Sequence, residues 1–88
     1  MGDQSMNVSV NPNIHPMRVS TNDLLKYMWR KGVTRAFDLI RDFGYTPGGA
    51  RHKLFMVRAT GLIINDRRGE WVVTRKGEKR LVYIGVKL

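Results

Sequence analysis

The chain has 88 residues and no cysteine, and 16 Lys and Arg against 7 Asp and Glu give it a formal net charge of +9 at pH 7. One small domain is expected at this length, without disulfides or thiolate metal sites. Because no apolar run approaches the roughly 20 residues of a membrane span and no signal-peptide pattern is visible, we expect no membrane contact and a cytoplasmic, nucleoid-associated location.

The positive charge is concentrated in the second half of the chain. Residues 46–88 carry ten Lys or Arg against three Asp or Glu, whereas residues 1–45 carry six against four. Such an excess predicts an acidic partner, with nucleic acid ahead of a membrane surface. The alternative, a basic surface that serves only solubility, does not account for this concentration.

Residues 1–18 are polar, contain two prolines and show no helical period. This pattern is typical of a flexible arm, so the folded domain is expected over residues 19–88. The sequence leaves open whether the arm is inert or extends along a partner.

A first helix is predicted to begin at Ser20–Asp23, where capping residues lead into an acid of the first turn. Leu24, Leu25 and Met28 form its buried stripe. Gly32 ends it.

A second helix is predicted from Arg35 to Phe43, with Thr34 as its N-cap. Val33, a single apolar residue between the two helices, is expected to add one rung to a small sheet. Because only residues 44–46 separate this helix from the next, the pair is expected to form a helix-turn-helix.

A third helix is predicted over residues 47–60, because Thr46 suits its N-cap, Pro47 its first turn and Gly61 its C-terminal cap. The stripe that can face a core consists of Ala50, Leu54, Val57 and Gly61. The opposite side consists of Arg51, His52, Phe55, Met56 and Ala59.

Two strands are predicted over residues 62–65 and 70–74, around a polar turn at 66–69 in which Gly69 supplies a positive φ.

The chain after the hairpin begins with Thr74, which is suited to cap a short helix that packs through Leu81. Residues 82–88 either continue this helix or form a strand. Trp71 and Tyr83 are expected to pack in the core or at its edge.

The order of a helix, a short β residue, two helices and a hairpin resembles the winged helix-turn-helix family over residues 20–82. Leu54-x-x-Val57-x-x-x-Gly61-Leu62-Ile63 is similar to a recognition helix that leads into a wing, and Val73-Thr74-x-x-Gly77 is similar to the exit from one. The Gly48-Gly49 pair departs from the Ser/Thr-rich start of this helix in many members.

The resemblance implies an α+β fold with a three-helix core, a two-stranded wing hairpin and a short C-terminal helix or strand. It also implies that the recognition helix, about residues 47–60, enters the DNA major groove while the wing, residues 62–74, touches the backbone or minor groove.

Candidate nucleic-acid contacts lie on the third helix, at the hairpin turn and just after the hairpin. Arg51 suits a bidentate contact to guanine or a phosphate, and Gly48 with Gly49 would let the backbone approach a phosphate, unless they form only a turn. Arg67 and Arg68 suit phosphate or minor-groove contact, with plain solvation as the alternative. The full candidate set is Thr46, Gly48, Gly49, Arg51, His52, Lys53, Phe55, Arg67, Arg68, Arg75 and Lys76.

Phe55 and Met56 are apolar residues on the expected outer side of the helix. Two explanations are open. They pack under the N-terminal arm or against a second subunit, or they contact thymine methyl groups.

Nothing in the sequence favours an enzyme. The two histidines, His15 and His52, have no carboxylate pair beside them, and no phosphate-binding or metal-ligand motif is present. Asp38 and Asp42 share a helix face with Arg35 and Arg41 nearby, which predicts a solvated, salt-bridged surface. We therefore expect no catalytic residue, metal or cofactor.

Taken together, these features predict a transcriptional regulator that binds double-stranded DNA, as a homodimer because two-fold sites raise specificity. The alternative is a winged-helix interaction module that binds a protein partner or structured RNA.

Overall fold

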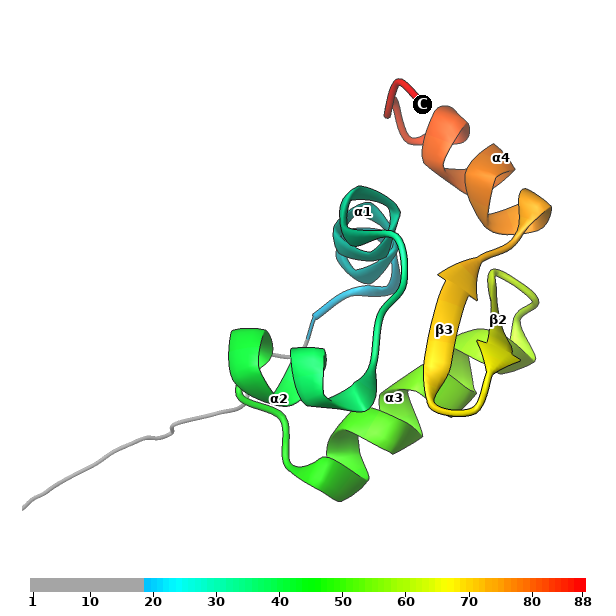
Figure 1. The fold of residues 1–88 in the computed structure, drawn as a ribbon. Helices are drawn as coiled ribbons and strands as arrows, with labels where there is room; N and C mark the ends of the chain where they lie inside the picture. Colours follow the sequence, from blue (N-terminus) through cyan, green and yellow to red (C-terminus); the bar gives the residue numbers. More distant parts are fainter. Residues whose placement is uncertain (1–18) are drawn as a thin grey trace, which may run out of the picture.

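Four helices and a two-stranded antiparallel hairpin form a small α+β domain in the computed structural model, which describes residues 19–88 (Figure 1). The arm predicted for residues 1–18 lies outside this part of the chain. The elements in chain order are α1 (Thr21–Lys31), α2 (Ala36–Phe43), α3 (Pro47–Ala59), β2 (Ile63–Arg67), β3 (Glu70–Val73) and α4 (Arg75–Tyr83).

Helix α1 forms as the sequence predicts. The Ser20 hydroxyl accepts a hydrogen bond from the Asp23 backbone N–H at 3.1 Å, which satisfies a donor of the first turn. Gly32 follows the last turn with a φ of 87°, a conformation that few other residues adopt readily. Leu24, Leu25 and Met28 are fully buried, as expected from their spacing.

The segment between α1 and α2 differs from the prediction by one residue. Thr34, predicted as an N-cap, is instead the rung of the sheet, because its N–H and C=O both pair with the backbone of Trp71, at 3.0 and 2.8 Å. Val33, predicted for that rung, is exposed. The N-cap is Arg35, whose backbone N–H donates to the Asp38 carboxylate at 2.8 Å.

Helices α2 and α3 are joined by residues 44–46 alone, as predicted, and Gly44 makes the turn with a φ of 75°. Ala50, Leu54 and Val57 of α3 face the core. Gly61, predicted as the end of that buried stripe, is exposed.

Strand β2 runs two residues further than predicted. Arg67 pairs with Glu70, so the turn proper is Arg68–Gly69, with a φ of 72° at Gly69. The register shifts between Asn65 and Arg67, which leaves Asp66 as the extra residue of a bulge.

Helix α4 begins after Thr74, whose hydroxyl accepts from the Gly77 N–H at 3.1 Å, and it packs through the fully buried Leu81. It continues through Tyr83, and the last five residues form neither of the two predicted structures. Tyr83, expected to pack, is 87% exposed.

The core lies where the four helices and the hairpin meet. Its largest fully buried apolar side chains come from every helix and from β2, and each contributes about 1.5–3 kcal/mol relative to an exposed one. They are Leu24, Leu25, Met28, Leu39, Leu54, Ile63 and Leu81.

Candidate nucleic-acid interface

At the start of α3, most of the backbone N–H groups already have a hydrogen-bond partner within the helix cap. The Thr46 hydroxyl accepts from the Gly49 N–H at 3.0 Å, and the Thr46 carbonyl accepts from the Ala50 N–H at 2.8 Å. Within residues 19–88, only Gly48 in this turn keeps an N–H without a partner, because Pro47 has none. A phosphate would therefore meet one backbone donor here rather than the two expected from the Gly48-Gly49 pair.

The two glycines serve different purposes. A methyl group added at Gly49 would lie 3.0 Å from the Thr46 hydroxyl oxygen, so the cap itself leaves little room for a side chain. A methyl group added at Gly48 would meet nothing within 4 Å. Gly48 thus opens a space on the outside of the helix.

The outer side of α3 is exposed, as predicted. Arg51 and His52 are exposed, Lys53 is partly exposed, and no acidic side chain of residues 19–88 pairs with any of the three. Arg58, which was not among the predicted contacts, lies two turns beyond Arg51 on the same flank and is also exposed. Arg58 follows Arg51 by seven residues, and this spacing, about two helical turns, could have identified it from the sequence.

Phe55 connects α3 to the hairpin. Its ring meets the ring of Trp71 edge to face, with centroids 5.4 Å apart and planes at 83°. The ring is nevertheless 51% exposed. Trp71, by contrast, is buried, as predicted.

The hairpin tip presents Arg67 and Arg68 to solvent without an acidic partner among the described residues. The Asn65 side-chain amide holds the backbone of the tip, because it donates to the carbonyls of Arg67 at 2.7 Å and Glu70 at 2.8 Å. Asn65 was not singled out by its sequence. The sequence clue to this role is that an Asn side chain in a turn can make a hydrogen bond that the backbone would otherwise make.

Arg75 and Lys76 lie at the opposite end of the hairpin from the tip, in the first turn of α4. The Lys76 ammonium donates to the carbonyl of Thr60 at 2.9 Å, so it caps the C-terminal end of α3. The Thr74 hydroxyl donates to the neighbouring carbonyl of Gly61. These bonds fix α4 to the junction between α3 and β2.

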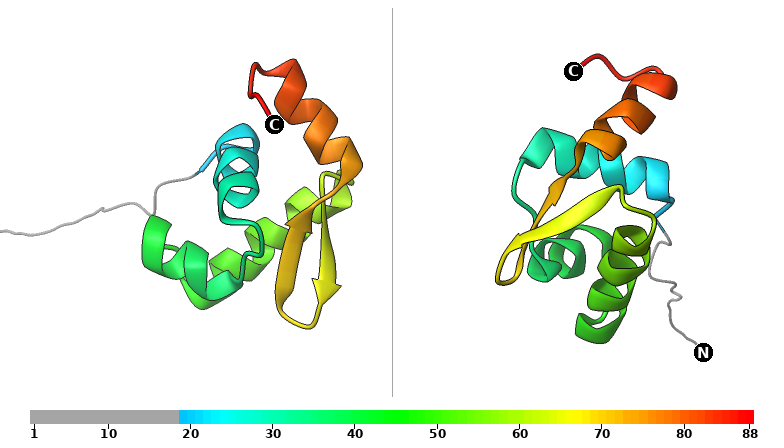
Figure 2. Two further views of the ribbon diagram at one scale, coloured as in Figure 1. Left: turned by 45° about the horizontal axis from the view of Figure 1, so that its top comes forward. Right: turned by 90° about the vertical axis from the view of Figure 1, so that its right-hand side faces the viewer.

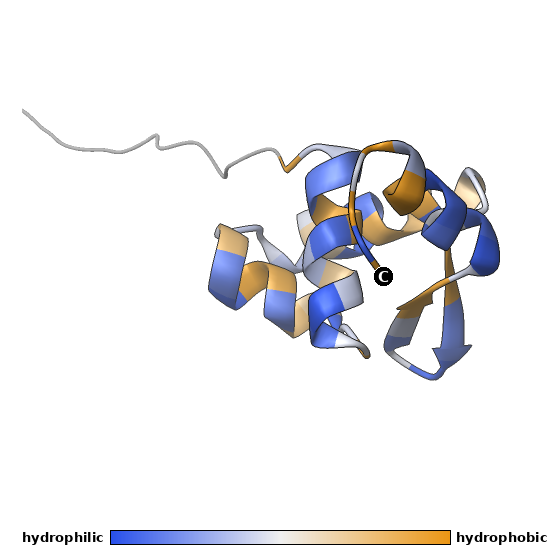
Figure 3. Ribbon diagram, turned by 90° about the horizontal axis from the view of Figure 1, so that it is seen from above, coloured by the Kyte–Doolittle hydropathy of each residue, from blue (hydrophilic) through white to orange (hydrophobic). Residues whose placement is uncertain are grey.

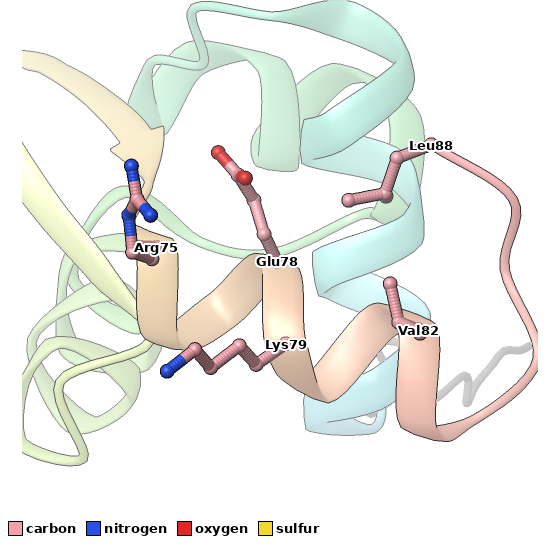
Figure 4. Close-up of a pocket in the computed structure, with 5 residues that line it drawn as sticks. All are labelled: Arg75, Glu78, Lys79, Val82 and Leu88. Carbon is pink, nitrogen blue, oxygen red and sulfur yellow. The ribbon is translucent and has the colours of Figure 1, made fainter.

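A shallow groove of about 290 Å³ runs along α4 on the side where Arg75, Glu78 and Val82 project (Figure 4). Leu88 folds back over its far end, and Lys79 points from a different side of the helix. Arg75 therefore shares its surroundings with the carboxylate of Glu78.

The views agree on the relative position of α3 and the hairpin. In Figure 1 and in both views of Figure 2, the N-terminal half of α3 and the tip between β2 and β3 lie in the part of the domain away from α4 and the C-terminus, and the right-hand view of Figure 2 shows the tip projecting to one side of α3. The hairpin is hydrophobic toward its base and hydrophilic toward its tip (Figure 3). The structure thus gathers most of the predicted contacts on one side and separates Arg75 and Lys76 from them.

Two acidic groups are neutralised by basic side chains, Asp38 on α2 and Glu70 beside the hairpin tip. Asp38, predicted to be solvated, is buried between the Lys31 ammonium at 3.4 Å and the Arg41 guanidinium at 3.2 Å. At the base of the tip, the Glu70 carboxylate pairs with the Arg35 guanidinium at 2.7 Å. Arg35 thereby neutralises an acid beside the two tip arginines, a role that its sequence position does not reveal.

Tyr27, Arg41 and Asp42 form a polar cluster between α1 and α2. Arg41 donates two hydrogen bonds to the Asp42 carboxylate, at 2.9 and 3.0 Å, and the Tyr27 hydroxyl donates a third. The bonds from Arg41 and then Tyr27 hold the pKa of Asp42 well below its ordinary value. Burial, followed by the hydrogen bond to Asp42, raises the pKa of Tyr27 from 10.0 to about 12.

The chain matches no protein-family model, no curated protein and no solved structure. In the described region, no group of three or more His, Cys, Asp or Glu side chains is arranged to hold a metal ion. None of the helices within residues 19–88 is long and apolar enough to cross a membrane.

Proposed function

We propose that this domain is a winged helix-turn-helix protein that binds duplex DNA and regulates transcription, with α3 in the major groove and the hairpin as the wing. One observation carries the proposal. The N-terminal half of α3, with Arg51, and the hairpin tip, with Arg67 and Arg68, lie in the same part of the domain, away from α4.

The arrangement of elements supports this assignment. The Thr34–Trp71 bridge adds a rung beside the hairpin, so the order is helix, rung, two helices, hairpin and final helix. A winged helix uses this layout to leave the outer face of the third helix and the hairpin tip free together. Both are exposed here.

Charge favours a polyanion as the partner. Arg51, Arg58, Arg67 and Arg68 have no acidic partner among residues 19–88, whereas Asp38, Asp42 and Glu70 are each paired with basic side chains. Guanidinium groups that have no acidic partner are free to bind phosphate oxygens through two parallel hydrogen bonds of defined geometry. The Lys and Arg side chains of α3 and the hairpin tip would supply roughly five phosphate contacts, so affinity falls steeply with salt.

A second candidate is an interaction module for a protein or structured RNA. The observation that favours it is the apolar surface at the end of α4, where Val82 is 57% exposed, Tyr83 87% and Leu88 55%. Uncovered apolar residues that lie together mark interfaces. A second copy of the chain at this surface would also give the homodimer expected for a two-fold DNA site.

The test is a pair of binding titrations with duplex DNA and duplex RNA of the same sequence, followed by selection of bound duplexes from a random DNA pool at near-physiological salt. A helix that reads the major groove enters B-form DNA but not the deep, narrow major groove of A-form RNA. DNA binding with weak RNA binding, and recovery of a common site, support the proposal. Tight RNA binding with feeble DNA binding contradicts it and favours the interaction module.

A further inference from the structure

The middle of the exposed side of α3 carries no Lys or Arg in the described structure. Five solvent-exposed residues follow one another at helical spacing along the middle of this side. They are Gly48, His52, Phe55, Met56 and Ala59. Basic residues occupy its two borders. Arg51 and Arg58 lie on the border toward the hairpin, and Lys53 lies on the other.

This pattern of charge matches the cross-section of a major groove. Phosphates form the two walls of the groove, where the border cations would meet them, and base edges form its floor. The thymine 5-methyl is an apolar group on that floor. A second copy of the chain fits this face poorly, because it would bring the like-charged borders together.

The two large apolar side chains of this face are well placed to contact such methyl groups. Phe55 is 51% exposed, yet its ring is oriented by the edge-to-face contact with the buried Trp71. An ordered side chain loses little rotamer freedom on binding. Met56, beside it, is 57% exposed, and its flexible thioether adapts to irregular apolar surfaces.

We propose that Phe55 and Met56 read thymine, through contact with its 5-methyl group in the major groove. The inference rests on the proposed function, since it requires α3 to enter duplex DNA. It assigns these residues to specificity, beside Arg51, and it separates them from Arg67 and Arg68, which supply charge.

The experiment replaces thymine by uracil in a duplex recovered by selection. Uracil lacks only the methyl group, so base pairing is kept while the apolar contact is removed. Affinities of the wild type, Phe55→Leu, Met56→Ala and Phe37→Leu are measured on both duplexes at one salt concentration. Phe37→Leu is the matched control for Phe55→Leu, because Phe37 is 62% exposed and lies on α2.

The wild type and Phe37→Leu should bind the uracil duplex about fourfold more weakly for each thymine methyl group that the protein touches, the equivalent of ~0.8 kcal/mol for one buried CH2 group. Met56→Ala and Phe55→Leu should bind the thymine duplex more weakly and show a smaller difference between the two duplexes. Equal wild-type affinity for both duplexes overturns the inference, as does a selected site without thymine.

The two failures are distinguishable. Tight binding to duplex DNA without any effect of the methyl group sinks this inference and leaves the proposed function standing. Absence of duplex binding removes both.

Discussion

The Nζ atom of Lys76 lies 2.9 Å from the carbonyl oxygen of Thr60 and donates a hydrogen bond to it across the junction between α4 and α3. A cation at the C-terminal end of a helix is favoured by the helix dipole and satisfies a carbonyl that the helix leaves free. Lys76 was predicted from the sequence to contact nucleic acid. In the structure, its ammonium donates a hydrogen bond to the carbonyl of Thr60.

Replacement of Lys76 by Met should lower the free energy of unfolding by about 0.5 kcal/mol, because the helix loses a capping cation. Lys79→Met is the matched control on the same helix, since Lys79 is exposed and makes no hydrogen bond to residues 19–88. Urea denaturation of both variants measures the difference. Equal stability of the two would show that the bond to Thr60 contributes nothing.

The Gly77→Ala variant should be destabilised by about 3 kcal/mol. An added methyl group would lie 2.3 Å from the Leu62 carbonyl oxygen and 2.6 Å from a methyl carbon of Val73, so α4 would have to move off the hairpin base. Thermal unfolding followed by circular dichroism measures the loss. An unfolding midpoint equal to that of the wild type would mean that α4 does not pack as closely as the structure indicates.

Gly48→Ala is the opposite case, because an added methyl group meets nothing within 4 Å. The variant should gain about 0.5–1 kcal/mol of stability, since glycine is a poor helix former. If the Gly48 backbone approaches a phosphate, the same methyl group should weaken binding to duplex DNA. Unchanged duplex affinity in the stabilised variant would place the phosphate elsewhere.

Tyr27 should titrate late in the folded protein. Its pKa is raised to about 12, whereas an unfolded chain leaves it near 10.0, so the folded state holds the proton more tightly. The resulting stabilisation is complete below pH 10 and is lost as the pH rises toward 12. Tyrosinate absorbance should show one of the described tyrosines titrating late, and Tyr27→Phe should remove that step. A late step that persists in the variant would belong to another residue.

Much of the fold could be predicted from short sequence patterns at the ends of helices and in turns. Ser20, Thr46 and Thr74 each cap a helix, and Gly69 adopts the positive φ expected of it. These predictions succeeded because a cap or a tight turn depends on a few neighbouring residues.

The errors came from partners that are distant in the sequence. Thr34 was predicted as a cap because its type suits one, but Trp71 takes its backbone groups. Asp38 is buried because Lys31, from the preceding helix, helps to neutralise it, and a helix-face argument does not include that residue. Tyr83 was misjudged in the same way, since only the packing of α4 shows which of its faces is covered.

Arg51→Ala should weaken binding to a selected duplex by about 1–3 kcal/mol, the range of one bidentate contact to a base. Binding to a random duplex should change less, because a base contact contributes little there. Competition titrations with both duplexes at one salt concentration separate the two affinities. Equal losses on both would show that Arg51 holds a phosphate rather than a base.

The central claim, that the helix and the hairpin tip meet one duplex, is tested most directly by the salt dependence of DNA affinity. Each phosphate contact adds about 0.9 to the slope of log affinity against log salt concentration, so Arg67→Ala combined with Arg68→Ala should reduce the slope by about 1.8. Lys26→Ala combined with Arg30→Ala is the matched control, because these residues lie beside the C-terminal tail. The proposal predicts a reduced slope for the tip variant alone. An unchanged slope for the tip variant, or an equal reduction for both, would contradict it.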